Sequence, residues 1–339
     1  MTSGVSEGTA RPARLGRGGG LRVTALGGGH GLSATLAALR HVTTDVTAVV
    51  TVADDGGSSG RLRAEMGVLP PGDLRMAVSA LCESSEWGEI WRDVLQHRFR
   101  TGGELDGHAV GNLLLVAIWE LLGDEVAGLD LIGRLLGAAG RVLPMSTTPL
   151  EIQADVRQRD RPDAPPLLVR GQSRVAVTSG IVEKVRLVPE DAEACPEAVA
   201  AVRDADWVIL GPGSWFTSVM PHLLLPGMAE ALRTTRARLA LTLNLSSQPG
   251  ETAGYSAADH LRSLCEYAPD LRVDVVIADP SAIEDLDDLV ACARMLGARV
   301  LLRQVGVGDG TPQHDPLRLA AAYRDAFEGI LGDVGETTR

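Results

Sequence analysis

A repeating unit of apolar segment, glycine-rich turn and helix most constrains what this chain can fold into. Residues 21–26 (LRVTAL) are apolar, 27–31 are GGGHG, and LSATLAALRHV then carries leucines at helical spacing. The β-branched segment 45–55 (DVTAVVTVADD) leads into a second glycine turn, and the rhythm returns with DWVILGPGS at 206–214. Such alternation predicts a parallel sheet covered by helices on both faces.

The rest of the chain fits one doubly wound, mostly parallel, Rossmann-like α/β domain over residues 21–335. Between 141 and 189, short β-like pieces (EIQADVR, PPLLVR, SRVAVTSG and KVRLVP) predict an inserted antiparallel or mixed β patch. Residues 1–20 are polar, rich in glycine and arginine, and predict a disordered tail. Helices are expected at 70–81, 106–123, 217–233 and 316–331; the second is almost wholly apolar and is therefore expected to be buried.

Composition excludes several classes of function. The chain has 339 residues and a net charge of −12, which disfavours nucleic acid as a partner. Its four cysteines show no CxxC spacing, which argues against a disulfide framework or a zinc site. No apolar run reaches about 18 residues, and no signal peptide is recognisable, so we expect a cytoplasmic protein without a membrane span. Symmetric dimers are the commonest soluble oligomers, so a homodimer is expected.

The first glycine turn is a candidate phosphate site, because ligands of α/β sheets lie beyond the carboxyl ends of the strands. Gly28, Gly29 and Gly31 let a backbone approach a phosphate, and the following helix offers free N–H groups. The turn lacks the lysine of a P-loop and matches a dinucleotide fingerprint only loosely. The alternative is a tight turn that needs glycine for its geometry. His30 either contacts the phosphate or lies exposed beside the turn.

The second glycine turn combines carboxylates, hydroxyls and a guanidinium: Asp54, Asp55, Ser58, Ser59 and Arg61. Carboxylates at a strand end suit Mg²⁺ held together with substrate phosphates, or a ribose hydroxyl. Arg61 suits a phosphate. We expect Asp54 to be the last strand residue and the functional carboxylate. We expect Asp55 to hold the turn by accepting hydrogen bonds from backbone N–H groups of the Gly-Gly-Ser-Ser stretch. The alternative is a solvated acidic turn.

Further candidates lie in four other segments. Asp73 is a ligand contact or a helix-start carboxylate paired with Arg75. His108 and Asn112 precede the apolar helix and could donate to a ligand, although Asn112 could only satisfy backbone groups there. A second anion cradle is predicted from Gly211, Gly213, Ser214 and Thr217, and base or sugar contacts are predicted from Asn244, Gln248 and Glu251.

Taken in order, GGGHGLS, VVTVADDGGSSGRLR, PPGDLR, GHAVGNL, LGPGSWFTS and QPGET closely resemble the YvcK family, the bacterial branch of the CofD-like superfamily. The resemblance spans about residues 21–330. It implies a CofD-like fold and binding of nucleotide-diphospho-sugars such as UDP-N-acetylglucosamine or UDP-glucose. It also implies a gluconeogenesis factor needed for cell shape and envelope growth on gluconeogenic carbon, and no particular catalysed reaction.

The alternative within the superfamily is the CofD branch. Its members transfer 2-phospho-L-lactate from a guanosine-diphospho intermediate to a deazaflavin, with Mg²⁺, and the resemblance places Asp54 at the metal. This chain's DDGGSSGRLR differs from that branch's pattern after the second strand and favours YvcK. Two residues depart from the family pattern: His30 stands where many relatives have threonine, and Gln313 where they often have arginine. An NAD-linked oxidoreductase would leave the 54–61 and 211–214 loops unexplained.

Overall fold

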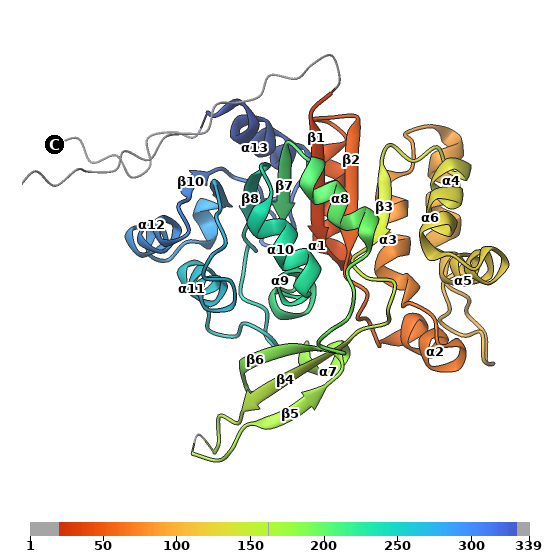
Figure 1. Cartoon of the computed structure of the whole chain (residues 1–339), viewed down its shortest axis with the longest axis horizontal. Helices are drawn as coiled ribbons and strands as arrows, with labels where there is room; N and C mark the ends of the chain where they lie inside the picture. Colours follow the sequence, from red (N-terminus) through yellow and green to blue (C-terminus); the bar gives the residue numbers. More distant parts are fainter. Residues whose placement is uncertain (1–19, 162, 331–339) are drawn as a thin grey trace, which may run out of the picture.

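The computed structural model describes residues 20–161 and 163–330 (Figure 1). The predicted disordered tail therefore lies, except for Gly20, outside the described residues. Within the described part of the chain, no helix is both long and apolar enough to cross a membrane. All four cysteines are free thiols.

A seven-stranded sheet of order β10-β9-β8-β7-β1-β2-β3 forms the centre of the protein, and every neighbouring pair is parallel. This confirms the predicted doubly wound α/β fold. Its strands are buried on both faces, as β1, β7 and β9 show, because helices cover both sides. The strands are β1 (Arg22–Gly27), β2 (Asp45–Val50), β3 (Arg141–Pro144), β7 (Trp207–Leu210), β8 (Arg238–Thr242), β9 (Val275–Ala278) and β10 (Arg299–Leu302).

The order of the strands fixes where a ligand can bind. The chain runs outward from β1 through β2 to β3, then returns to the other side of β1 and continues from β7 to β10. The connections after β1 and β7 therefore leave the sheet toward opposite sides. The crevice at this switch point lies beyond Gly27 of β1 and Leu210 of β7, where α/β sheets bind ligands.

Two helical layers enclose the sheet (Figure 1). On one face α1 contacts both α3 and α13, and on the other α8 contacts α10. The longer helices are α1 (Gly29–Leu39), α2 (Gly57–Met66), α3 (Pro71–Leu81), α4 (Glu86–Gln96), α5 (Val110–Leu122), α6 (Glu125–Leu135), α8 (Pro196–Asp204), α10 (Pro226–Thr234), α11 (Ala257–Tyr267), α12 (Leu286–Met295) and α13 (Pro316–Glu328). The shorter ones are α7 (Gln172–Val175), α9 (Pro221–Leu224), the π-helix η1 (Trp215–Val219) and the 3-10 helix η2 (Pro280–Ala282).

A small antiparallel sheet projects beyond the carboxyl ends of the main strands (Figure 1). It has the order β5-β4-β6, with β4 (Glu151–Arg157), β5 (Leu167–Arg170) and β6 (Ile181–Val188). We call residues 151–188, which include α7, the flap. Two details differ from the sequence-based expectation. Residues 141–144 form β3 of the main sheet. SRVAVTSG contains part of α7 rather than a strand, because the Ser173 N–H at its start donates to Asp55 and not to a neighbouring strand.

Three other expectations were wrong in detail. Helix α5 is buried on one face only, and Leu121 at its end is 84% exposed, because an apolar pattern does not reveal how many faces a fold covers. The single helix expected at 217–233 is divided into η1, α9 and α10, since Pro221 and Pro226 start new helices. Strand β2 ends at Val50, so Asp54 lies in a loop and not in the strand.

The first turn of α1 is pressed against the loop that follows β7. A Cβ atom on Gly31 would lie 2.3 Å from the carbonyl oxygen of Pro212 and 2.6 Å from Cα of Gly213. Both contacts are with backbone, which cannot rotate away. Only glycine therefore allows this approach, and it sets the distance between the two loops at the switch point.

Replacing Gly31 with alanine should lower the free energy of unfolding by about 1–3 kcal/mol, because the added methyl group overpacks this contact. Urea denaturation measures the change. Gly102→Ala is the matched control: Gly102 is exposed, and no described residue lies within 4 Å of the added Cβ. The control should change stability by less than about 0.5 kcal/mol. Equal stability of Gly31→Ala and the control would contradict the close contact.

Candidate functional site

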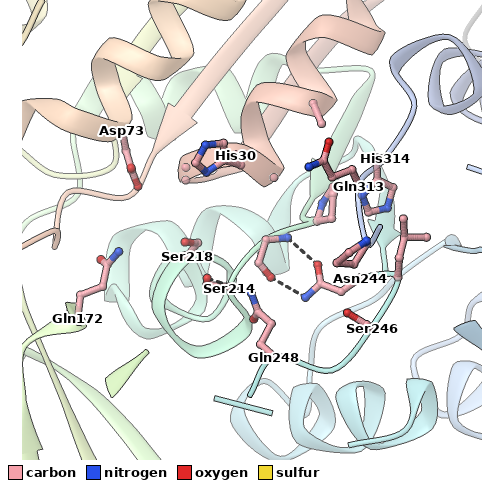
Figure 2. A pocket seen from close by; sticks show the side chains of 18 residues that line it. His30, Asp73, Gln172, Ser214, Ser218, Asn244, Ser246, Gln248, Gln313 and His314 are labelled. Atoms are coloured by element: carbon pink, nitrogen blue, oxygen red, sulfur yellow. Dashed lines mark hydrogen bonds between the residues drawn. The ribbon is translucent and has the colours of Figure 1, made fainter. Parts of the chain in front are cut away.

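A cavity of about 520 Å³ lies at the switch point, which is within the size range of small-molecule sites. Its walls come from the first turn of α1, the loops after β7 and β8, the start of α3, the flap and the segment before α13 (Figure 2). The lining residues are Gly28, Gly29, His30, Gly31, Ala34, Asp73, Gln172, Pro212, Gly213, Ser214, Ser218, Asn244, Leu245, Ser246, Gln248, Pro312, Gln313 and His314.

The first turn of α1 forms one wall. Gly28 is its extended N-cap residue, and Gly29 has φ +55°, a left-handed conformation that favours glycine. Helix geometry leaves the N–H groups of a first turn without intrahelical partners, and the helix dipole adds positive potential there. His30 follows Gly29 and lines the cavity (Figure 2). The Gly29 backbone already hydrogen-bonds the Asp73 carboxylate, and the rest of this turn can hold an anion.

The opposite wall is formed by Gly213, Ser214 and Ser218. Ser218 is buried in η1, and its backbone oxygen accepts a hydrogen bond from the Thr51 hydroxyl at 2.9 Å. The hydroxyl groups of Ser214 and Ser218 lie near the cavity (Figure 2). They add donors across from the N–H groups of α1.

The loop after β8 holds this second wall in place. Asn244 accepts a hydrogen bond from the Gly213 N–H at 2.9 Å and donates one to the Gly213 oxygen at 2.8 Å (Figure 2). Gln248 accepts from the Trp215 N–H at 3.1 Å and donates to the Ser214 hydroxyl at 3.1 Å. These amide groups therefore fix the shape of the wall, a role that sequence analysis did not anticipate.

Glu251 supports the same wall from beneath. It is buried and accepts hydrogen bonds from the Phe216 N–H at 2.7 Å and from the Thr217 hydroxyl at 2.5 Å. Burial raises the pKa of Glu251, and the hydrogen bonds from Thr217 and Phe216 act in the opposite direction. Neither Glu251 nor Thr217 lines the cavity. Their observed contacts make them a support for the start of η1.

Two carboxylates lie close together at one end of the cavity. Asp73 lines it at the start of α3, and Asp54 lies behind. A Cβ atom on Gly72 would be 3.1 Å from Oδ2 of Asp54. Burial, and to a smaller extent the charge of Asp54, raise the pKa of Asp73 to about 7, although a hydrogen bond from the Gly29 backbone and the charge of Arg75 act in the opposite direction. This end of the cavity therefore favours a bound cation or a hydrogen-bond donor.

The adjacent aspartates have different partners from those expected. Asp54 Oδ1 accepts a hydrogen bond from the Gly56 N–H at 2.9 Å, so Asp54 holds the turn. Asp55 Oδ1 accepts from the Ser173 N–H of the flap at 2.8 Å. The expectation that Asp55 bonds to the Gly-Gly-Ser-Ser backbone was wrong, because the flap supplies a partner that local sequence cannot reveal.

The remaining predicted residues form a polar cluster beside the cavity rather than in its lining. The Ser58 hydroxyl lies 3.0 Å from Nδ1 of His108 and accepts a hydrogen bond from Asn112 at 3.0 Å. Asn112 accepts in turn from Arg75 at 2.9 Å. Arg61 donates hydrogen bonds to the backbone oxygens of residues 104 and 106. Ser59 is buried nearby at α2, and Gly211 lies at the end of β7.

Sequence analysis missed several lining residues. Gln172 comes from the flap, Ser246 from the loop after β8, and Pro312 to His314 from the segment before α13. Gln313 had been noted only as a departure from the family pattern. Gln172 follows no recognisable motif, and only the docking of the flap brings it to the cavity.

The charge of the lining limits what the cavity can bind unaided. No lysine or arginine is among its lining residues in the described part of the chain. The described residues also contain no cluster of three or more histidine, cysteine or acidic side chains that could hold a metal. Two carboxylates are, however, what Mg²⁺ uses when substrate phosphates supply further ligands. Asp54 and Asp73 fit a Mg²⁺ ion that arrives with a phosphate ligand.

The fold and the cavity together define an α/β protein with a ligand site at the topological switch point of a parallel sheet. Residues 23–289 match the family model described as 2-phospho-L-lactate transferase CofD. A protein of Mycobacterium tuberculosis, provisionally named a gluconeogenesis factor, is 53% identical over 317 residues, covering 92% of this chain and 91% of the relative. The Bacillus subtilis gluconeogenesis factor is 37% identical, covering 78% of this chain and 80% of the relative.

The chain belongs to the CofD family, and within it to the branch of the gluconeogenesis factors. A crystal structure of a UPF0052-family protein from Bacillus halodurans agrees with this assignment. Its TM-score is 0.81 at 33% identity, covering 91% of this chain and 99% of the other. The family and fold that the sequence motifs had predicted are thus confirmed.

Asp73 makes stability depend on pH. Its pKa in the folded protein, about 7, lies above its ordinary value of 3.8. The folded state therefore binds a proton more tightly than the unfolded state. The resulting stabilisation is complete below about pH 4 and is lost as the pH rises through 7.

Replacing Asp73 with asparagine removes this titration and keeps the shape of the side chain. Between pH 5 and pH 8, the wild type should lose about 2 kcal/mol more unfolding free energy than the variant does. Urea denaturation of both proteins at the two pH values measures the difference. Parallel losses would show that Asp73 titrates normally.

Proposed function

We propose that this protein binds a nucleotide-diphospho-sugar of the UDP type, UDP-N-acetylglucosamine or UDP-glucose, and acts as a regulatory factor in gluconeogenic growth. Cell shape and envelope synthesis would be the processes it serves. The single observation that carries the proposal is the cavity between the first turn of α1 and the Gly213–Ser218 wall. The family resemblance supports the choice of ligand, and the names of the relatives support the role in gluconeogenic growth.

A diphosphate fits the middle of this cavity. The N–H groups and dipole of α1 face it from one side, and the hydroxyls of Ser214 and Ser218 face it from the other. Since no lysine or arginine of the described residues lines the cavity, a cation is the natural complement to the phosphate charge. Mg²⁺ at Asp54 and Asp73 would neutralise phosphate charge, while the protein's own groups position the ligand.

The phosphate wall can be tested with two nearly isosteric variants. Gly29→Asn and Gly29→Asp place side chains of the same shape at a φ of +55°, where both residues are tolerated better than most. Only aspartate brings a negative charge to the phosphate. We expect Gly29→Asp to bind UDP-N-acetylglucosamine at least roughly tenfold more weakly than Gly29→Asn, about 1.4 kcal/mol.

Isothermal titration calorimetry measures both affinities, and circular dichroism checks that both variants are folded. Equal affinities in two folded variants would remove the first turn of α1 from the phosphate site. Absence of binding by the wild type to any UDP-sugar would overturn the proposed function.

The second candidate is a Mg²⁺-dependent transferase of the CofD type. The specific observation in its favour is the Asp54–Asp73 pair, together with the match to the CofD family model. In such a reaction, the α1 turn would hold charge that develops on a transferring phosphoryl group. The sequence after Asp55 lacks the acceptor-side pattern of that branch, which is why binding is preferred.

Asp54→Asn tests the metal. For the wild type, Mg²⁺ should raise the affinity for UDP-N-acetylglucosamine roughly tenfold, and the variant should lose this enhancement while still binding without Mg²⁺. Titrations with Mg²⁺ and with EDTA measure both. A Mg²⁺ effect of the same size in the variant would exclude Asp54 as a ligand.

A turnover assay separates the two candidate functions. With a guanosine-diphospho-lactate donor and a deazaflavin acceptor, no product is expected. Product formation at about 1 s⁻¹ or faster would overturn the preference for a binding protein. The cytoplasmic location and the homodimer remain predictions, and light scattering would test the dimer.

A further inference from the structure

Gln172 lines the cavity from the flap, and one polar atom of its side chain lacks a partner. Its Oε1 is buried and accepts no hydrogen bond from any described residue. The side chain lies on the same side of the cavity as Asp73, away from Asn244 and His314 (Figure 2). A buried acceptor without a donor is costly. In this rotamer the oxygen is shielded from the cavity, so rotation of the amide toward a ligand that supplies the donor would be favoured.

Asp55 holds Gln172 in this position. Its Oδ1 accepts a hydrogen bond from the N–H of Ser173, the residue directly after Gln172. Gly171, directly before Gln172, has φ +92°, and a Cβ there would lie 1.9 Å from Oδ2 of Asp55. The carboxylate thus lies against the backbone on both sides of Gln172. The loop after β2 therefore fixes how far Gln172 enters the cavity.

The other half of the protein holds the flap from the opposite side. A Cβ on Gly250 would lie 1.7 Å from the backbone oxygen of Ala176, so the loop after β8 packs directly on α7. Arg159 of the flap donates a hydrogen bond to the Ala253 oxygen at 3.2 Å. Two independent contacts therefore place α7 at the cavity, and Gln172 is not a chance approach of a free loop.

The two ends of the cavity differ in chemistry. At one end, Leu245 and Pro312 offer apolar surface beside the polar groups of Gln313 and His314, which suits the faces and edges of a base. At the other end, the Gln172 amide lies beside Asp73, whose carboxylate is assigned to the cation. A sugar carries several hydroxyl donors and few apolar faces, so the end with the Gln172 amide suits a sugar.

We propose that Gln172 is a specificity-determining residue that accepts a hydrogen bond from a hydroxyl of the ligand's sugar, and that Asp55 is the residue that positions it. The assignment rests on the proposed function, because it concerns the orientation of the same nucleotide-sugar. The diphosphate lies in the middle, the base near Leu245 and Pro312, and the sugar near Gln172. The flap thus decides which sugar is accepted, and the α1 turn binds the phosphates of all of them.

The test compares UDP-N-acetylglucosamine with UDP, which lacks the sugar, by calorimetry in Mg²⁺. Gln172→Ala should weaken UDP-N-acetylglucosamine binding roughly tenfold and leave UDP binding within about twofold of the wild type. Ser173→Ala is the matched control on the same helix, because its exposed side chain is removed while the N–H that Asp55 accepts is kept. The control should bind both ligands normally.

Asp55 is tested by the same pair of ligands. Asp55→Ala should reproduce the selective loss, and Asp55→Asn, which keeps an oxygen acceptor for the Ser173 N–H, should restore most of the affinity for the nucleotide-sugar. A merely structural role would weaken UDP to the same extent. UDP binding also reports that each variant is folded.

The possible failures are distinguishable. If the wild type binds neither ligand, the proposed function fails and this assignment fails with it. If the wild type binds both, and Gln172→Ala changes neither affinity or lowers both equally, the assignment of Gln172 to the sugar is overturned while the proposed function stands.

Discussion

The site depends on one backbone contact, the approach of the first turn of α1 to the loop after β7. Strands β1 and β7 are neighbours, yet their connections leave the sheet in opposite directions. The crevice would be wide if side chains separated the two loops. Gly31 against the Pro212 carbonyl removes that separation. Asn244 then fixes Gly213 through both its N–H and its oxygen, so the far wall keeps its distance from the helix.

The electrostatics of the cavity follow from this construction. Its positive potential comes from backbone N–H groups and a helix dipole rather than from side-chain cations, since none lines it in the described residues. Dipoles hold a phosphate in a fixed place, but they do not neutralise its whole charge. The acidic pair Asp54 and Asp73 would repel a phosphate by itself. A cation between them and a phosphate ligand would make the two ends of the cavity compatible.

Much of the fold could be predicted from the sequence, because parallel strands buried on both faces leave a clear apolar signal. The glycine turns and the loops after β7 and β8 were also placed at the correct edge, since the carboxyl ends of parallel strands meet there. Burial was predicted less well. Helix α5 is apolar on almost all faces, but the rest of the described chain buries only one of them. A local sequence pattern does not show which elements will pack against a helix.

The details of the site were harder to predict, because they depend on contacts between distant segments. Adjacent residues such as Asp54 and Asp55 offer identical chemistry, and sequence cannot tell which one meets the flap more than 100 residues later. Asn244 and Gln248 have the donors and acceptors that could contact a ligand. In the structure, these groups instead form hydrogen bonds with loop backbone and with the hydroxyl of a serine. An amide side chain at the end of a strand can therefore either contact a ligand or hold a loop in place, and the sequence does not show which role it has.

The same reasoning predicts that position 172 of the flap tolerates substitution better than the rest of the site. The α1 turn, the Gly213 loop and their supports are bound by backbone geometry, so a substitution there disturbs the fold as well as the ligand. The Gln172 side chain is not constrained in this way, because its Oε1 has no hydrogen-bond partner among the described residues. The contacts of Asp55 are with the backbone around Gln172. A different side chain at this position would change what the cavity accepts without changing how the flap docks. Under the proposed function, separating the groups that hold the phosphates from the group that contacts the sugar would let one fold serve different nucleotide-sugars.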